Sequence, residues 1–347
     1  MNLFKWFLFP ISIIFWFITS VRNFFYDFGW LKSSGFNLPI IGIGNITVGG
    51  TGKTPLTSYI TKLLSEENKI AILSKGYGRK TKDFNYVELD SKIISVGDEP
   101  MQTKQNFPNQ IVAVDHKRVN GVLNILSDHP ETSAIILDDS FQHRSIKIGY
   151  NILLIDYNRP IYKDYLLPIG FLREISKGIK RANCIVVTKC PEHLTKNEAD
   201  EIKEKINFNG DIFFSKVKYE KIIALNNKNK SLNYNQISDV LLVTAIAQNK
   251  PIINYLESKN INCSTFRFRD HHNYNKKDIE DIINKKETLN YNTIILTTEK
   301  DAQKLKDFSK LNDHPVYYLK VSVDFLWNKD KFDQKLFDYV RNNQENS

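Results

Sequence analysis

The segment that most restricts the fold is a glycine-rich stretch that follows a short apolar run. Residues 38–44 read LPIIGIG, an apolar run bounded by proline and glycine, which predicts a buried strand. Residues 45–54 read NITVGGTGKT, and a helix is expected from Pro55 to about Ser65. This order is typical of a phosphate-binding loop, because glycines let backbone N–H groups surround phosphate oxygens at the positive end of a helix. The residues expected to bind a nucleotide are Thr47, Val48, Gly49, Gly50, Thr51, Gly52, Lys53 and Thr54.

Two residues at the end of this loop have specific expected roles. Lys53 is expected to reach the β- and γ-phosphates, and the Thr54 hydroxyl to bind Mg²⁺. The usual pattern, G-x-x-x-x-G-K-[ST], has glycine where this chain has Thr47, so the loop is a variant. The dense run of glycines at 49–52 favours phosphate binding over the alternative, a purely structural turn.

A second apolar run ends in two carboxylates. Residues 134–137 read AIIL and are followed by Asp138 and Asp139. A strand that delivers acidic side chains at its carboxyl end is the usual partner of a phosphate loop. We expect one of the two aspartates to hold Mg²⁺, directly or through water.

Further apolar runs predict an α/β fold. They lie at 69–74, 110–114, 151–155 and 184–188, and a second series begins near Asp211. The charged stretch 191–210 is read as a helix or a linker. A chain of 347 residues suggests about two domains. We expect a mostly parallel sheet flanked by helices, as in P-loop NTPases. The expected domains are a membrane-associating helix at 1–30, a P-loop core at 31–210 and a smaller C-terminal α/β domain at 211–347.

The first thirty residues predict contact with a membrane. Residues 6–21 carry no charge and, as a helix, span about 24 Å, less than the ~30 Å hydrocarbon core. Pro10 argues further against an unbroken spanning helix. Lys5, Ser12, Thr19 and Asn23 form a narrow polar stripe among many aromatic residues. We favour an anchor lying in the plane of the membrane over a spanning anchor, a signal peptide or a buried core helix.

The charge balance and the cysteines narrow the class of protein. The net charge of +9 suits nucleic acid, an anionic membrane or a phosphorylated substrate. Nucleic acid is the least favoured partner, because the lysines are scattered and are not clustered among aromatic residues. Three cysteines, Cys184, Cys190 and Cys263, are too few for a disulfide scaffold or a four-cysteine zinc site, which favours a reducing cytoplasm.

Other polar clusters are candidates for chemistry. Asp98 lies in a turn-like segment, VGDEP, and a carboxylate there would suit proton transfer during phosphoryl transfer. Residues 269–274 bring together two histidines, for which pairing with a carboxylate is favoured over zinc binding. Segments 75–79 and 167–174 combine turn residues with arginines that suit phosphate recognition.

These segments together resemble the tetraacyldisaccharide 4′-kinase (lipid A 4′-kinase) family. The resemblance covers residues 1 to about 325, in family order, and includes NITVGGTGKTP (45–55), LSKGYGR (73–79), VGDEP (96–100), LDDSFQHR (137–144), 167–174, DHH (270–272) and TEKD (298–301). Lys75 stands where the family often has arginine, and Ile175 where it often has proline.

The resemblance implies a function. Such an enzyme transfers the γ-phosphate of ATP to the 4′-hydroxyl of a tetraacylated glucosamine disaccharide 1-phosphate, at the cytoplasmic face of the inner membrane. It implies ATP and Mg²⁺ as cofactors, the acylated disaccharide and the membrane surface as partners, no nucleic acid and no obligate protein partner.

The resemblance also implies roles for individual residues. Asp98 is the expected catalytic base, with His271 as its partner, although His272 stays open as an alternative. Lys53, Thr54 and Asp139 are expected to serve phosphates and Mg²⁺, assisted by Asp138, and Arg173 and Glu174 to take part in catalysis. The secondary candidates are Arg118, Gln142 and Lys300.

A rival interpretation is a membrane-associated P-loop ATPase or GTPase that switches a protein partner. Guanine recognition requires Asn-Lys-x-Asp after a strand. The nearest segment, residues 188–191, reads TKCP and lacks both the asparagine and the aspartate, which argues against a GTPase.

Overall fold

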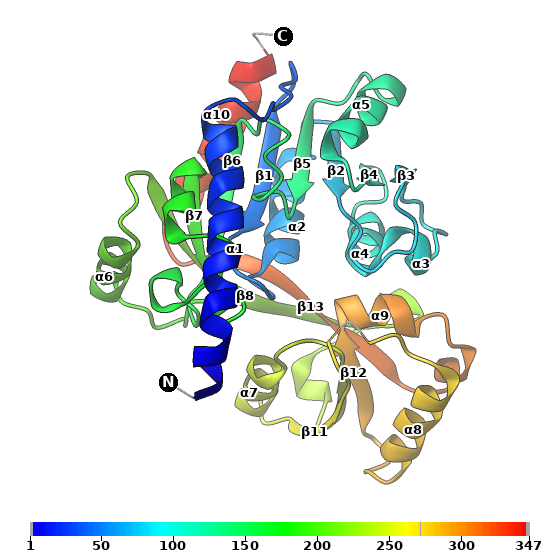
Figure 1. Cartoon of the computed structure of the whole chain (residues 1–347). Helices are drawn as coiled ribbons and strands as arrows, with labels where there is room; N and C mark the ends of the chain where they lie inside the picture. Colours follow the sequence, from blue (N-terminus) through cyan, green and yellow to red (C-terminus); the bar gives the residue numbers. More distant parts are fainter. Residues whose placement is uncertain (1–2, 271, 345–347) are drawn as a thin grey trace.

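The computed structural model describes residues 3–270 and 272–344 (Figure 1). The helices are α1 (Leu3–Asp27), α2 (Lys53–Leu64), α3 (Ile93–Val96), α4 (Asp98–Asn106), α5 (Arg118–Asp128), α6 (Lys196–Ile206), α7 (Lys250–Ser258), α8 (Lys276–Glu287), α9 (Glu299–Leu305) and α10 (Lys329–Gln344). The strands are β1 (Ile40–Asn45), β2 (Ile70–Ser74), β3 (Asn85–Tyr86), β4 (Ile111–Val114), β5 (Ala134–Asp138), β6 (Tyr150–Asp156), β7 (Cys184–Thr188), β8 (Asp211–Ala224), β9 (Asn227–Leu232), β10 (Asp239–Thr244), β11 (Asn262–Arg267), β12 (Ile294–Thr298) and β13 (Val316–Phe325).

The first half of the chain is built on a parallel sheet with β1 at its centre. β1 pairs in parallel with β5 on one side and β6 on the other, and β2, β4 and β7 extend the sheet. All residues of β1 and β5 are buried, because helices cover both faces of a parallel sheet. The expected α/β class is confirmed. The carboxyl ends of β1 and β5 lie side by side, which brings the phosphate loop and the two aspartates together.

Two long strands connect the halves. The start of β8 pairs in parallel with β7, and the rest of β8 pairs antiparallel with β13, which in turn is parallel to β12. Figure 1 shows β8 and β13 running from the upper half of the molecule into the lower one. In the smaller lower half, β10 and β11 continue the same sheet.

The end of the chain returns to the first half. Phe332, Leu336 and Val340 of α10 belong to the core cluster that contains Ile41 of β1 and Ile60 of α2. The expected division into domains at residue 211 stays a prediction. β8 begins at Asp211 as part of the first sheet, and α10, at the end of the chain, packs beside α2.

The sequence patterns located most elements of the first half within a few residues. The predicted strands correspond to β1, β2, β4, β5, β6 and β7, and the stretch 191–210 contains a helix, α6. Pro10 argues against an unbroken spanning helix, but α1 is unbroken through Pro10, and whether it spans a membrane stays a prediction. Pro10 is the eighth residue of α1, so it lies past the first turn and removes one backbone donor from the helix interior.

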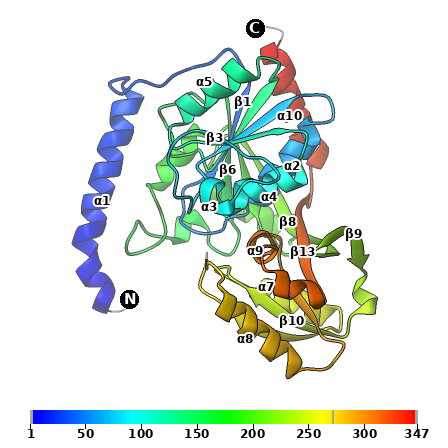
Figure 2. The ribbon, with the colours of Figure 1, turned by 90° about the vertical axis from the view of Figure 1, so that its right-hand side faces the viewer.

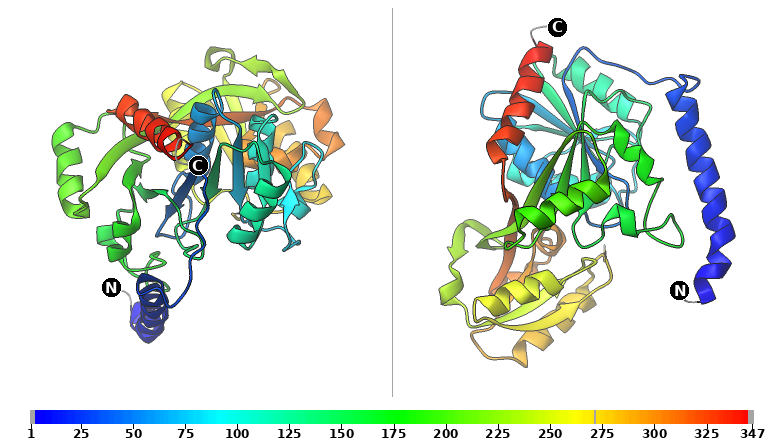
Figure 3. Two further views of the ribbon diagram at one scale, coloured as in Figure 1. Left: turned by 90° about the horizontal axis from the view of Figure 1, so that it is seen from above. Right: turned by 90° about the vertical axis from the view of Figure 1, so that its left-hand side faces the viewer.

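Helix α1 lies along the outside of the first half (Figures 2 and 3). Its segment Phe7–Asp27 is long and apolar enough to cross a membrane by length and composition alone, and 6% of its most apolar window is buried. More than half of the circumference of α1 exposes large apolar side chains: Phe7, Phe9, Ile11, Ile13, Ile14, Trp16, Phe17, Ile18 and Phe24.

The polar stripe of α1 faces the protein. Ser12 Oγ donates a hydrogen bond to the Leu166 carbonyl at 3.3 Å, and Asn23 Nδ2 donates one to Glu174 Oε2 at 3.2 Å. Thr19 bonds to carbonyls of its own helix. The side chain of Lys5, the first member of the expected stripe, lies outside the described part.

Candidate active site

The phosphate loop connects β1 to α2 and is held in place from several sides. Gly49 and Gly52 have φ angles of 102° and 87°, which glycine adopts without strain. Asn45 Nδ2 donates to Thr51 Oγ1 at 2.8 Å, and Thr188 Oγ1 donates to the Thr51 carbonyl at 2.8 Å. The Lys189 ammonium donates to the Gly50 carbonyl and to Asp156 Oδ2. The loop is therefore fixed by its neighbours.

Thr47 shows why the loop departs from the usual glycine pattern. This residue is buried and forms an antiparallel bridge with Leu172. Next to it, the Val48 N–H donates to the Phe171 carbonyl at 2.7 Å. An extended residue paired with a neighbouring segment does not need the conformational freedom of glycine. The 167–174 segment thus lies against the phosphate loop, and phosphate recognition by its arginine, Arg173, stays a prediction.

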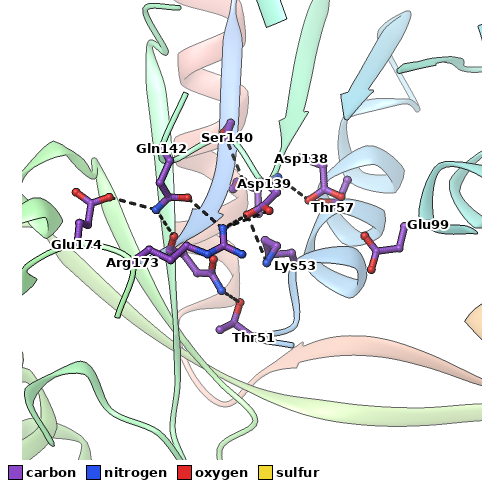
Figure 4. Close-up of polar contacts among 12 residues, drawn as sticks. Thr51, Lys53, Thr57, Glu99, Asp138, Asp139, Ser140, Gln142, Arg173 and Glu174 are labelled. Carbon is purple, nitrogen blue, oxygen red and sulfur yellow. Dashed lines mark hydrogen bonds and ion pairs between the residues drawn. The ribbon is translucent and has the colours of Figure 1, made fainter. Parts of the chain in front are cut away.

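Lys53, Asp139 and Arg173 form a charged cluster at the start of α2 (Figure 4). Lys53 Nζ lies 3.5 Å from Asp139 Oδ1, and Arg173 Nη1 lies 3.3 Å from the same oxygen. Burial acts to raise the pKa of Asp139, but the two cations outweigh burial and lower this pKa below its ordinary value. Asp139 is therefore an ionised carboxylate between two cations that suit phosphate.

Asp138 occupies a different environment from its neighbour. Its carboxylate accepts from Thr57 Oγ1 at 3.4 Å and from the Asp139 N–H at 2.9 Å. Burial raises the pKa of Asp138 to about 7, and the nearby Glu99 carboxylate acts in the same direction. Arg118, also buried, donates to the Asp138 carbonyl at 3.2 Å and thus supports the end of β5 from behind.

The described residues contain no cluster of three or more His, Cys, Asp or Glu side chains that could hold a metal ion by themselves. The Thr54 hydroxyl and the Asp138 and Asp139 carboxylates are nonetheless hard oxygen donors beside the phosphate loop. Mg²⁺ is usually bound by one or two protein oxygens together with phosphates and water. The donor set therefore fits Mg²⁺ held jointly with a nucleotide.

Asp98 begins α4, after Gly97, at the boundary between the two halves. Its buried carboxylate lies 3.1 Å from Lys304 Nζ and 3.9 Å from Lys300 Nζ, both on α9 of the second half. Lys300 also lies 3.0 Å from Glu99 Oε1. Sequence reasoning missed Lys304, although a lysine four residues after Lys300 on a helix would have indicated a shared face.

Of the two candidate histidines, His271 lies outside the described residues. His272 Nε2 lies 2.8 Å from Asp278 Oδ2, and its ring stacks on Phe268. The choice between them as the partner of Asp98 stays a prediction.

Glu174 is separated from the phosphate loop by Gln142 (Figure 4). Glu174 is 1% exposed, and its carboxylate accepts from Gln142 Nε2 at 3.1 Å and from Arg181 Nη2 at 2.7 Å. Gln142 in turn accepts from Arg173 Nη1 at 3.2 Å. The structure thus joins Glu174 to the charged cluster only indirectly.

Two cavities border the site. One, of about 430 Å³, lies beside Thr54 and Pro55 and is closed on its other side by Tyr219, Ile252 and Leu319 of the second half. Its position next to the start of α2 and its apolar walls suit a nucleotide base. The other, of about 710 Å³, contains Asp98. The cations that line this second cavity are Lys80, Lys92 and Lys304.

A phosphate loop and an aspartate pair on adjacent parallel strands, with a further buried carboxylate in a neighbouring cavity, define a P-loop phosphotransferase. A profile of the family described as tetraacyldisaccharide-1-P 4′-kinase matches residues 4–341. The chain belongs to this family.

Individual relatives agree with this assignment. A tetraacyldisaccharide 4′-kinase of Flavobacterium johnsoniae is 41% identical over 99% of this chain and 100% of the relative. One of Flavobacterium psychrophilum is 42% identical over the full length of both. The crystal structure of LpxK from Aquifex aeolicus, in complex with ATP, is 28% identical, covers 97% of this chain and 99% of its own, and has a TM-score of 0.77.

Proposed function

We propose that this protein phosphorylates the 4′-hydroxyl of a tetraacylated glucosamine disaccharide 1-phosphate, with ATP as donor, to give the 1,4′-bisphosphate of lipid A biosynthesis. The observation that carries the proposal is the Lys53–Asp139–Arg173 cluster at the phosphate loop, in a chain of this family. Glu99, the neighbour of Asp98 on α4, is close enough to the adjacent Asp138 carboxylate to raise its pKa. A nucleotide switch is not favoured, because the curated relatives described above are named as kinases.

The donor nucleotide occupies the phosphate loop. Backbone N–H groups of residues 49–52 bind its phosphates, and the base enters the 430 Å³ cavity between the halves. Lys53 and Arg173 stabilise the charge that develops on the transferred phosphoryl group. Thr54 and Asp139 hold Mg²⁺, with Asp138 assisting, and the ion supplies charge neutralisation at the phosphates.

The acceptor enters from the side of the 710 Å³ cavity. The Asp98 carboxylate accepts the proton of the 4′-hydroxyl as its oxygen bonds to the γ-phosphorus, and ADP leaves in line. His271 is the proposed partner of Asp98. Lys300 and Lys304 hold Asp98 in place from α9.

Helix α1 brings the enzyme to its substrate. A disaccharide with four acyl chains stays in the bilayer, so the enzyme must work at the surface of the membrane. The exposed apolar face of α1 supports a monotopic or single-helix anchor at the cytoplasmic face of the inner membrane. The net charge of +9 suits that anionic surface.

The direct test is transfer of labelled γ-phosphate from ATP to an acylated glucosamine disaccharide 1-phosphate in detergent micelles. We expect labelled lipid with the wild-type protein and none above background with Lys53→Ala. Release of inorganic phosphate without labelled lipid, stimulated by a protein partner, would instead support the nucleotide switch.

A further inference from the structure

We propose that Asn23, on the membrane-associating helix α1, is a positioning residue for the phosphoryl-transfer site, acting through Glu174. This inference rests on the proposed function and adds a second role to α1. Beyond anchoring the enzyme, the helix sets the geometry of the residues that handle the transferred phosphoryl group.

A continuous chain of polar contacts connects α1 to the phosphate loop. Asn23 Nδ2 donates to Glu174 Oε2 at 3.2 Å, and Gln142 Nε2 donates to Glu174 Oε1 at 3.1 Å. Arg173 Nη1 then donates to Gln142 Oε1 at 3.2 Å and to Asp139 Oδ1 at 3.3 Å. Figure 4 shows this chain from Glu174 to Lys53. Each member therefore touches the next, and the last contacts Lys53.

Glu174, which connects Asn23 to Gln142, is closed to solvent, and this makes its geometry sensitive to a lost contact. Glu174 is 1% exposed, so its carboxylate depends on protein donors. Arg181 and Asn23 both donate to the same oxygen, Oε2. Removing Asn23 leaves Arg181 as the dominant donor and allows the carboxylate to turn toward it. Gln142, which also donates to the Asn45 carbonyl at 2.8 Å, loses part of its alignment as a result.

Arg144 makes a second set of contacts with α1, close to Asn23. Arg144, two residues after Gln142, donates to the Asn23 carbonyl at 2.9 Å and to Asp27 Oδ1 at 2.6 Å. Its guanidinium also lies 5.1 Å from the centre of the Tyr26 ring. The short segment after β5 thus contacts α1 through Arg144 and the charged cluster through Gln142. A helix that served only as an anchor would need neither contact.

The test compares Asn23→Ala with a matched control on the same helix, Thr19→Ala, whose hydroxyl bonds only to α1 carbonyls. We expect Asn23→Ala to lower kcat for lipid phosphorylation roughly tenfold, the size expected for one hydrogen bond to a charged group. The KM for ATP and binding to phospholipid vesicles should stay within about twofold of wild type. Thr19→Ala should match wild type in all three measurements.

Two further variants separate positioning from a general disturbance of the helix. Asn23→Asp places a second carboxylate beside the buried Glu174, so its loss of kcat should exceed that of Asn23→Ala. In a Glu174→Ala background, Asn23→Ala should cause less than a twofold further loss, because the chain is already interrupted.

The results distinguish the two proposals. If wild-type protein phosphorylates the lipid and Asn23→Ala keeps its kcat within twofold, the positioning role is wrong while the function stands. A loss of kcat that persists in the Glu174→Ala background would also overturn the positioning role. So would a loss of kcat that parallels a loss of binding to vesicles. If wild-type protein yields no labelled lipid, the proposed function itself fails.

Discussion

At the scale of single residues, Asp98 is the group whose removal should be most informative. Its carboxylate is buried at the start of α4 and lies against Lys304 of the other half. We expect Asp98→Asn to lower kcat at least ~100-fold, because an amide cannot accept the proton of the acceptor hydroxyl. The KM for ATP should change little, since the phosphate loop is untouched.

Steady-state kinetics with the lipid acceptor measure this prediction. Asp313→Asn, an exposed aspartate remote from the cleft, provides the matched control. A near wild-type kcat for Asp98→Asn would remove Asp98 from the role of base and direct attention to other groups in its cavity.

At the same scale, the sequence located the residues that act through local patterns. The phosphate loop and the Asp138–Asp139 pair were predictable, because each lies in a short segment whose glycines or apolar run carry the signal. Contacts between distant segments were not. Asn23 and Glu174 are 151 residues apart in sequence, and no local pattern indicates that a polar stripe on an apolar helix faces the protein.

At the scale of elements, α1 presents a testable membrane-binding face. Ile14, Phe17 and Ile18 share one side of the helix and are each about 60% exposed. Replacing all three by serine removes apolar area that would otherwise be buried in lipid, at about 25 cal/mol per Å². We expect co-sedimentation with anionic phospholipid vesicles to weaken at least ~tenfold.

The control is Leu123→Ser, which replaces an exposed leucine on α5 and so tests the loss of an apolar surface residue elsewhere. Unchanged sedimentation of the triple variant would contradict the role of α1 as an anchor.

The contact between α4 and α9 predicts a pH effect on stability. Glu299 is buried there and accepts from Gln102 Nε2 and Asn106 Nδ2, both at 2.9 Å. Burial raises the pKa of Glu299 above its ordinary value of 4.5. The folded protein therefore binds this proton more tightly than the unfolded chain, and the contribution to stability is lost as pH rises above 4.5 through the folded pKa.

Glu299→Gln removes this titration. We expect the Tm of wild type, measured relative to that of Glu299→Gln, to decrease as pH rises above 4.5. Differential scanning calorimetry at matched ionic strength measures the two slopes, with the exposed Glu257→Gln as control. Equal slopes for wild type and Glu299→Gln would contradict the assignment of this pH dependence to Glu299.

At the scale of the whole molecule, the arrangement of the halves was not predictable from the sequence. The pattern near Asp211 indicated a strand, but its continuation to Ala224 depends on two different partners, β7 and β13. Similarly, α10 follows the second half in sequence but packs on the core of the first half, and no local pattern indicates which half it covers. Such features follow from pairing across the chain, and local periodicity carries no information about them.

The shared cavity between the halves gives the last prediction. Thr54 of the first half and Ile252 of α7 line the same 430 Å³ space, so a bound nucleotide should stabilise both halves. At a concentration 100 times its Kd, a ligand stabilises the folded state by about 2.7 kcal/mol. We expect a non-hydrolysable ATP analogue with Mg²⁺ to slow hydrogen exchange of backbone amides in α2 and also in α7. Lys53→Ala should reduce both effects, because it weakens phosphate binding. Protection confined to α2 would show that the second half does not close on the nucleotide.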